Sequence, residues 1–216
     1  TENYEHKGKH WQLWLPALRP RPFTQPHPYM IRACSGEESM LEMARLGRPF
    51  LMNVQTDDVT RHRMDLYRQT MRTAGFDDAH VAGAVDETWV WRNIFIAETD
   101  AEAERVGIPL FEAQREQRAK MRNRILKERG ESMAKPGETG VAKTAARDVI
   151  EHSLIAGSPA TVAERLAKVD AIGVGGVILQ FRVGPSPFDV TQNSIELFMN
   201  KVAPEFQTTP AVAAAT

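Results

Sequence analysis

Residues 89–103, WVWRNIFIAETDAEA, decide the fold class of this chain of 216 residues. Aromatic and β-branched side chains dominate residues 89–97, and such side chains favour a strand. Glu98, Thr99 and Asp100 follow, and a capping hydroxyl with acidic neighbours is typical of a helix start. A strand this apolar is typical of a parallel sheet covered by helices. The stretch therefore predicts one strand–helix unit of an α/β protein.

Three further apolar runs repeat this unit. Residues 29–34, 49–54 and 177–181 are short and apolar, and each is followed by a stretch of helical periodicity. No Asn-Gly or Asp-Gly dipeptide marks a tight hairpin. We therefore expect four parallel strands, side by side in chain order. Because a closed eight-stranded barrel takes typically about 250 residues, a chain of 216 residues with four units has no room for the other four.

Capping residues and glycines predict the ends of the helices. Ser35 is expected to cap a first helix that stops at Gly47. Asp57 or Asp58 is expected to cap a second helix that runs to about Ala74. Further helices are expected over residues 101–107, 109–130, 161–172 and 192–202.

Other segments are expected to be irregular. Residues 1–28 are rich in proline and predict a stiff connector, and the low-complexity residues 207–216 predict a frayed tail. Pro204 is expected to stop the last helix. The polar residues 127–143 predict either a mobile lid that excludes water or a plain surface loop.

The composition excludes several classes of protein. Hydrophobic residues make up 42% and charged residues 25%, with a formal net charge of -1, so the chain is neither globally disordered nor polybasic. We therefore expect no nucleic-acid or membrane partner. The single cysteine, Cys34, excludes an internal disulfide framework and is typical of a cytoplasmic protein. The histidines show no metal-ligand spacing, so no metal site is expected.

Four stretches carry a resemblance to a known family. They are PRPFTQPHPYMIRACSGEES, MARLGRPFLM, RNIFIAETDAEA and AGSPATVAERLAKVDAIGVGGVILQF, and the closing SIELFMNKVAPEF adds to them. Each alone is a weak signal, but together, in this order and spacing, the chain resembles the C-terminal half of the bacterial luciferase-like, flavin-dependent monooxygenases. The likeness covers nearly all of residues 8–206.

The resemblance implies a fold and an activity. The fold would be a (β/α)8 TIM barrel, of which residues 1–206 would form strands five to eight, without the N-terminal half. The activity would be a monooxygenase that uses reduced FMN, supplied by a flavin reductase, and dioxygen to oxidise a small organic substrate, with a homodimer as the full-length assembly. The alternatives are an F420-dependent reductase of the same fold and a non-catalytic flavin-binding half-barrel. A half-barrel by itself exposes sheet edges, so the chain alone is expected to aggregate, to dimerise and so close a barrel, or to fold poorly.

The resemblance places the flavin phosphate at Ser35, Gly36 and Ser39. A helix N-terminus with free amides, a hydroxyl and a glycine can hold a phosphate, although Ser35 could equally be only the helix cap. The chain departs from the family pattern here, because Glu37 and Glu38 add negative charge beside the anion.

Polar residues at two strand ends are the other candidates. Asn53 and Gln180 follow apolar runs, and their amides could bind a flavin ring edge or a substrate, or only stabilise loops. Arg32 could balance a phosphate charge or form a surface ion pair, and Cys34 is expected to be a small core residue. Residues 89 and 91, both Trp, share one strand face and are expected to pack in the core or between barrel and helices, not to form a stacking platform. The sequence names no catalytic residue, and the family resemblance places most reactive groups in the other half of the barrel.

Overall fold

A computed structural model describes residues 2–17, 19–20, 23, 31–130 and 153–206. The chain divides into two compact units, Thr1–Ile31 and Arg32–Thr216. The predicted tail, 207–216, and most of the predicted loop over 127–143 lie outside the described residues.

The first unit is a β-hairpin. Strands β1 (Glu2–Lys7) and β2 (Gln12–Ala17) pair antiparallel, with Lys7 opposite Gln12. The Gly8 N–H donates a hydrogen bond to the Trp11 carbonyl over 2.9 Å and closes the turn. The predicted irregular segment is therefore wrong over these residues. The turn carries Gly-Lys-His-Trp in place of the dipeptides that mark the tightest hairpins.

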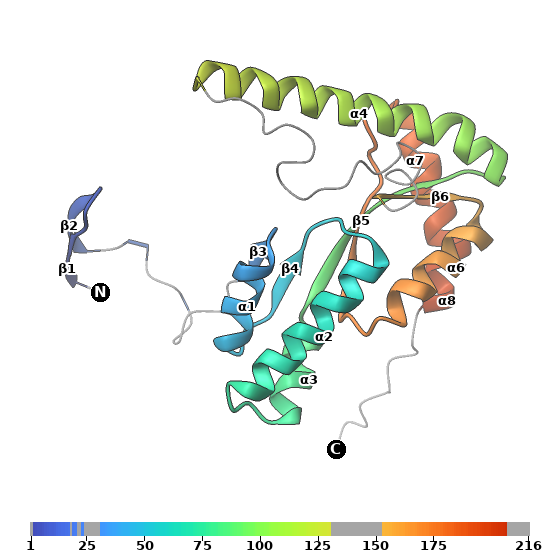
Figure 1. The fold of residues 1–216 in the computed structure, drawn as a ribbon. Coiled ribbons are helices and arrows are strands. Elements are labelled where there is room, and N and C mark those ends of the chain that lie inside the picture. The colour runs from blue at the N-terminus through green and yellow to red at the C-terminus, as the bar shows by residue number, and fades with distance from the viewer. Residues whose placement is uncertain (1, 18, 21–22, 24–30, 131–152, 207–216) are drawn as a thin grey trace. The chain divides into compact units, whose positions relative to one another are not determined.

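The second unit is an α/β sheet (Figure 1). Its strands are β3 (Arg32–Cys34), β4 (Phe50–Met52), β5 (Trp89–Ile96), β6 (Leu154–Gly157) and β7 (Gly176–Gln180). Its helical segments are α1 (Glu37–Arg45), α2 (Asp57–Thr73), α3 (Asp78–Asp86), α4 (Asp100–Glu128), α6 (Pro159–Asp170), α7 (Phe188–Leu197), the π-helix η1 (Phe198–Val202) and α8 (Ala203–Phe206).

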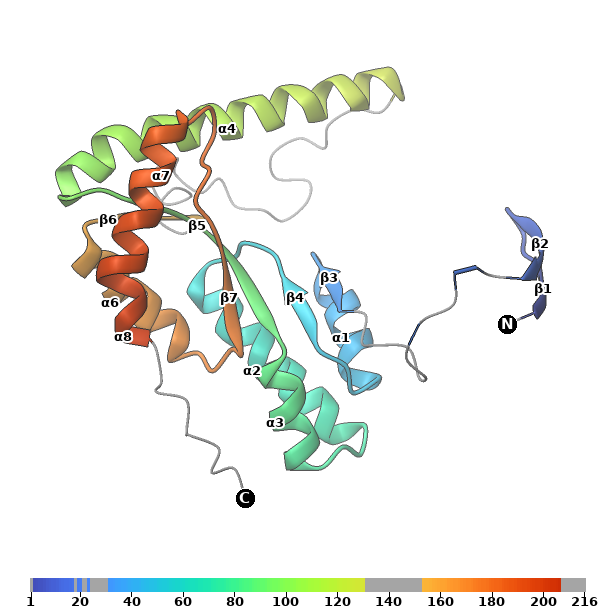
Figure 2. The same cartoon turned by 180° about the vertical axis from the view of Figure 1, so that it is seen from behind.

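The order of the four predicted strands is confirmed. β3 pairs with β4, β4 with β5, and β5 with β7, all of them parallel. Figure 2 shows β4, β5 and β7 side by side in this order. The short strand β6 was not predicted. Because Asn93 faces both Leu154 of β6 and Gln180 of β7, these two strands lie on opposite edges of β5.

Helices cover one face of the sheet more fully than the other. Val90 of β5 is buried in a core cluster with residues of α1, α2 and α3. These helices lie in front of the sheet in Figure 1, and Figure 2 shows the other face. On that face Trp89 and Trp91 are 43% and 40% exposed. The expectation that both tryptophans pack in the core is wrong, because no helix of the described residues covers their part of the face.

The helix caps differ from the predicted ones at two places. Gly36 is the N-cap of α1, and no side chain caps that helix, so the expected Ser35 cap is wrong. Thr56, not Asp57 or Asp58, caps α2 and accepts from the Val59 N–H. The predicted stop at Gly47 is confirmed: its φ of +63° suits a glycine, and the Arg48 N–H donates to the Met43 carbonyl.

Three helical segments also differ from the expectations. α4 is one helix across Gly107 and Pro109, where two were predicted, and Gly107 lets it approach Phe95, whose ring lies 2.7 Å from the position a Cβ would take. α3, capped by Asp77, was not predicted. Pro204 does not stop the last helix, since η1 runs directly into α8, which extends to Phe206.

Candidate functional site

The carboxyl ends of the parallel strands bring two predicted residues together. Cys34 and Met52 are register partners, so Ser35 and Asn53 are the first residues beyond two neighbouring strands. Both are exposed. Ligand sites of open α/β sheets lie at this edge of the sheet, so the pair lies where a ligand would be expected.

The N-terminus of α1 starts in the same place. Gly36 has an extended backbone, and no side chain accepts from the amides of the first turn, which are the usual anion donors of a helix. The Ser39 hydroxyl donates to the Gly36 carbonyl over 2.9 Å. The Ser39 hydroxyl proton is therefore already engaged. The Ser35 hydroxyl, in contrast, forms no hydrogen bond with the described residues.

A basic residue of α2 approaches this turn and was missed by the sequence analysis. Arg63 Nη1 donates to the Ser35 carbonyl over 3.4 Å, and His62 Nε2 lies 4.0 Å from Glu37 Oε2. The Arg63 guanidinium can offset the negative charge of the acidic first turn of α1, and His62 can do so only when it is protonated. The run Arg-His-Arg over residues 61–63 was the available signal, but only the tertiary fold brings it to Ser35.

Two other candidates near this turn have local partners. Arg32 Nη1 lies 2.6 Å from Glu42 Oε2, so it forms a surface ion pair with α1. Cys34 is 1% exposed and belongs to the core cluster, which confirms its expected role as a small core residue.

Gln180 lies apart from Ser35 and Asn53. Gln180 belongs to β7 and is the register partner of Asn93 in β5. Because β7 and β4 lie on opposite edges of β5, the whole of β5 separates Gln180 from Asn53. With strands about 4.8 Å apart, the two backbones are about 10 Å from each other. The Gln180 amide donates to the Arg182 carbonyl over 3.0 Å, a local bond of the kind that stabilises a loop.

A small hollow lies at the carboxyl end of β5. It has a volume of about 260 Å³, and Phe95, Val106 and Val190 contribute apolar walls. Glu102 from the first turn of α4 and Asp189 from the first turn of α7 also line it, with Asn193 beside them. The sequence analysis missed these polar residues because they belong to helices whose relative position only the fold decides.

An ion pair between a buried arginine and a partly exposed aspartate supports the sheet below this edge. Arg92 of β5 is 2% exposed, and its Nη2 donates to Asp57 Oδ1 over 3.0 Å and to Thr60 Oγ1 over 3.1 Å. Burial lowers the pKa of Arg92, and the hydrogen bond to Asp57 opposes that shift. An arginine stays charged over the whole working range of a protein, so the pair ties β5 to the start of α2.

The part of the chain that the structure describes contains neither a candidate metal site nor a candidate membrane-spanning helix. There, His, Cys, Asp and Glu side chains nowhere gather in a group of three that could hold a metal ion. Among the described helices, none combines the length and the apolarity needed to cross a bilayer.

Comparison with known proteins gives a family-model match and structural neighbours. The model described as "Luciferase-like monooxygenase" matches residues 1–175. No curated protein matches the chain.

Among solved structures, the monooxygenase RslO1 from Streptomyces bottropensis has a TM-score of 0.64 at 21% identity, over 96% of this chain and 57% of that one. The oxygenating constituent of 3,6-diketocamphane monooxygenase from Pseudomonas putida, solved with FMN, has a TM-score of 0.58 at 19% identity, over 96% and 59%. The coenzyme F420-dependent tetrahydromethanopterin reductase from Methanopyrus kandleri has a TM-score of 0.56 at 17% identity, over 95% and 59%.

At these identities the likeness is one of fold. The chain spans less than three fifths of the length of each of these three structures.

Proposed function

Because the family model covers most of the chain, the chain belongs to the luciferase-like monooxygenase family, and we propose that it is part of a flavin-dependent monooxygenase. The family and its monooxygenase neighbours indicate an oxidoreductase. The proposed enzyme uses reduced FMN, delivered by a separate reductase, and dioxygen to oxidise a small organic substrate. Solved neighbours that depend on F420 favour an F420-dependent reductase as the second candidate.

The proposal depends chiefly on one observation, the uncapped N-terminus of α1 beside Arg63. The residues present fit a phosphate, because free amides, the Ser35 hydroxyl and a guanidinium converge at the carboxyl edge of the sheet. Glu37 and Glu38 oppose an anion, and the nearby Arg63 guanidinium offsets part of their charge. In this proposal Ser35 and the amides of Gly36 and Ser39 hold the phosphate.

The roles of this chain's residues are binding and orientation. Asn53, one strand away from Ser35, is placed to hydrogen-bond a polar edge of the bound ring system. Gln180 lies on the far side of β5 and is placed to contact a substrate or the distal part of the cofactor. When bound, a reduced flavin would supply the redox chemistry, and the protein would orient the reactants and exclude water.

The exposed face of the sheet supports the proposed barrel. Trp89 and Trp91 would point into the interior of a closed (β/α)8 barrel, where side chains from further strands would cover them. In this view the described unit is the C-terminal half of the barrel, and the complete enzyme is a homodimer. In the non-catalytic alternative, no further strands cover Trp89 and Trp91, and the protein is a flavin-binding half-barrel.

Cofactor binding and oxygen consumption test the proposal. The intact protein is titrated with reduced FMN and with F420 in the absence of oxygen, and oxygen uptake is then followed with a panel of small organic substrates. Tight binding of reduced FMN, with oxygen uptake that depends on substrate, is the expected result. Binding of F420 with its reduction by an alcohol, and no oxygen uptake, would establish the second candidate. Flavin binding without any turnover would favour the non-catalytic alternative.

A further inference from the structure

The second half of α4 projects beyond the core of its unit. Figure 1 and Figure 2 both show the helix running past the other helices and strands towards residue 128. Phe111 and Gln114 are the last buried residues of α4, at 4% and 7% exposure. From residue 115 to residue 128, every residue except Leu126 is exposed. About half of the helix therefore lacks the tertiary packing that stabilises most helices in proteins.

This projecting segment is strongly basic. Residues 115–129 contain seven arginines and lysines but only two glutamates. Both glutamates already have partners within the helix. Glu116 Oε1 lies 2.7 Å from Lys120 Nζ, and Glu128 Oε1 lies 2.9 Å from Arg124 Nε. The excess positive charge therefore belongs to residues outside these two ion pairs.

One face of the segment combines unpaired arginines with apolar side chains. Among the described residues, the four arginines of this face form no ion pair and no side-chain hydrogen bond. Met121 and Ile125 lie between them and are 57% and 43% exposed. Spacings of three and four residues place all six side chains on one side of the helix. We call this face the arginine stripe, and its residues are Arg115, Arg118, Met121, Arg122, Ile125 and Arg129.

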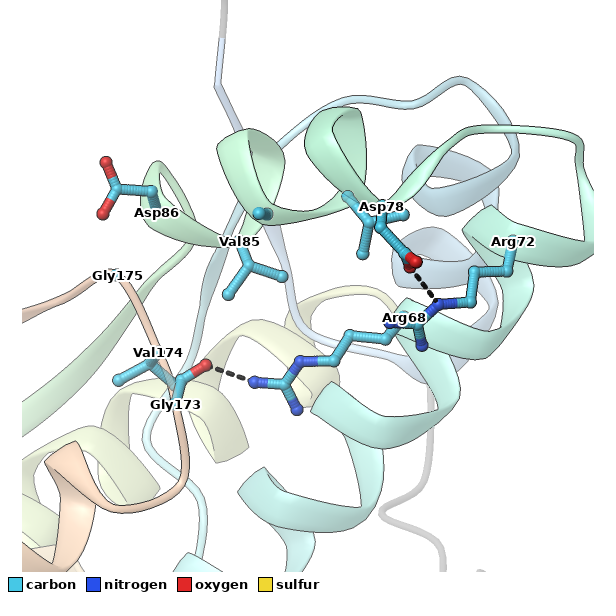
Figure 3. Close-up of a pocket in the computed structure, with 10 residues that line it drawn as sticks. Arg68, Arg72, Asp78, Val85, Asp86, Gly173, Val174 and Gly175 are labelled. Carbon is cyan, nitrogen blue, oxygen red and sulfur yellow. Dashed lines mark hydrogen bonds and ion pairs between the residues drawn. The ribbon is translucent and has the colours of Figure 1, made fainter.

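Two arginines of α2 differ from the arginine stripe, because the protein itself engages them. They line a hollow of about 510 Å³ between α2, α3 and the segment before β7 (Figure 3). Arg68 donates to the carbonyls of Ile172 and Gly173. Arg72 donates through Nε to Asp78 over 2.9 Å. These two guanidiniums join parts of the fold, whereas those of the arginine stripe are available to carboxylates or phosphates of a partner.

The mixture of cationic and apolar groups selects the kind of partner. A helix that binds a membrane surface separates its cationic and apolar residues onto different faces, whereas the arginine stripe has both on one face. A nucleic acid would pair with the guanidiniums but leave Met121 and Ile125 uncovered. A second copy of the arginine stripe would carry the same charge and repel the first. A protein surface with both carboxylates and aliphatic side chains matches all of these groups.

The spacing of the stripe favours a helix as that surface. Arg118 and Arg122 are four residues apart, which is about 6 Å along the helix axis. Carboxylates four residues apart on a partner helix have the same spacing, so the charged groups can meet in register. A helix also satisfies its own backbone hydrogen bonds. A strand placed on α4 would leave its N–H and C=O groups without partners.

We propose that the arginine stripe binds an acidic amphipathic helix of another protein. The carboxylates of that helix contact the four arginines, and its aliphatic side chains cover Met121 and Ile125. The interaction surface is formed by α4 alone, so the proposal does not depend on the flavin site or on the proposed oxygenase activity.

Synthetic peptides test the proposal from the partner's side. The probe is a fluorescein-labelled peptide of three repeats of Ala-Glu-Leu-Glu-Ala-Leu-Glu, and fluorescence anisotropy follows its binding to the intact protein. We expect saturable binding that becomes about tenfold weaker with Gln in place of every Glu, and about fivefold weaker with Ala in place of every Leu. Affinity that neither replacement changes, or no saturable binding at millimolar concentration, would overturn the proposal.

Competing polyanions distinguish a protein partner from the other classes. Oligothymidylate and phosphatidylserine vesicles are titrated at the same concentration of negative charge as the probe. We expect both to bind more weakly than the probe, and Met121→Gln/Ile125→Gln to weaken binding of the probe alone. Tighter binding of the oligonucleotide or of the vesicles would overturn the proposal in favour of a nucleic acid or a lipid surface.

Variants test the proposal from the side of α4. Arg118→Gln/Arg122→Gln should weaken binding of the probe about fivefold, the usual size of two exposed ion pairs. The matched control, Lys120→Gln/Arg124→Gln, removes the same charge from the opposite side of the helix, where both residues already have partners. We expect the control to change the affinity less than about twofold. Circular dichroism verifies the helix content of both variants. Equal losses would show that binding follows net charge alone and would overturn the assignment to the arginine stripe.

Discussion

Asp100 Oδ1 accepts a hydrogen bond from the backbone N–H of Ser158 over 2.6 Å. This bond joins the first turn of α4 to the residue that follows β6 and caps α6. It also connects the two sequence motifs RNIFIAETDAEA and AGSPATVAERL, which lie far apart in the chain. The hydrogen bonds from the Ser158 backbone, and then from the Thr161 and Ser158 side chains, lower the pKa of Asp100.

Asp100→Asn should therefore lower the melting temperature at neutral pH, because the amide is a weaker acceptor than the carboxylate. Since the pKa of Asp100 is lower in the folded state than in the unfolded state, its contribution is complete above about pH 4 and is lost as the pH falls through the folded pKa. The difference in melting temperature between the wild type and the variant should shrink in that acidic range. Glu104→Gln, an exposed position on α4, is the control, and a pH-independent difference would contradict the assignment.

The Asp57–Arg92 pair predicts an asymmetric mutational effect. Asp57→Asn should lower the free energy of unfolding by about 2 kcal/mol, because it leaves the buried Arg92 guanidinium without its only ion-pair partner among the described residues, while the hydrogen bond to Thr60 is kept. Asp58→Asn, in the same first turn but without Arg92, should cost only about 0.5 kcal/mol from the helix dipole. Urea denaturation measures both.

The double variant Arg92→Met/Asp57→Asn should be more stable than Asp57→Asn alone, because no uncompensated charge stays buried. A double variant that is less stable than the single one would show that Arg92 stabilises the sheet through its other contacts.

Two glycines predict opposite effects of an added methyl group. A Cβ on Gly175 would lie 1.8 Å from the Asp86 carbonyl oxygen, so Gly175→Ala has to displace the segment before β7. We expect it to lower the free energy of unfolding by about 2 kcal/mol or more. Gly83 of α3 has no atom within 4 Å of that position, so Gly83→Ala should stabilise the chain by about 0.5–1 kcal/mol. Thermal unfolding of the two variants, side by side, checks both signs.

Arg63 predicts a phosphate-specific effect at the proposed flavin site. Arg63→Gln should weaken binding of FMN by about fivefold and leave binding of riboflavin, which has no phosphate, unchanged. Arg61→Gln is the matched control, because Arg61 is also exposed on α2 and makes no contact with Ser35. Equal losses for FMN and riboflavin would place Arg63 elsewhere than at the phosphate.

The exposed tryptophans predict self-association of the 216-residue chain. Trp89→Thr/Trp91→Thr should raise the monomer fraction in sedimentation experiments, because the wild-type chain presents these apolar rings on an incompletely covered sheet face. Trp11→Thr/Trp14→Thr is the control, since these residues are at least as exposed but belong to the hairpin. A wild-type chain that is monodisperse and monomeric would contradict this prediction.

The sequence predicted the parts of the fold that local patterns decide. The apolar runs that became β3, β4, β5 and β7 are recognisable without the structure, because each is short, mostly apolar and followed by a stretch of helical periodicity. β6 was missed although it is apolar and no shorter than β3 or β4, so the strand pattern was present in the sequence. α4 was divided in two because Gly107 and Pro109 usually end a helix, and packing against Phe95 outweighs that preference.

The class of fold, the order of four of the five described strands and the family could be predicted from the sequence, since these follow from apolar periodicity and from motifs in a fixed order. Only the tertiary structure decided which charged groups meet: Arg63 with Ser35, Arg92 with Asp57, Asp100 with Ser158, and Arg68 with the carbonyls before β7. The physical reason is that a side-chain contact depends on the relative position of whole helices and strands, which the burial of their apolar faces fixes. A charged residue on a helix surface has the same local pattern whether it faces water or a neighbouring element.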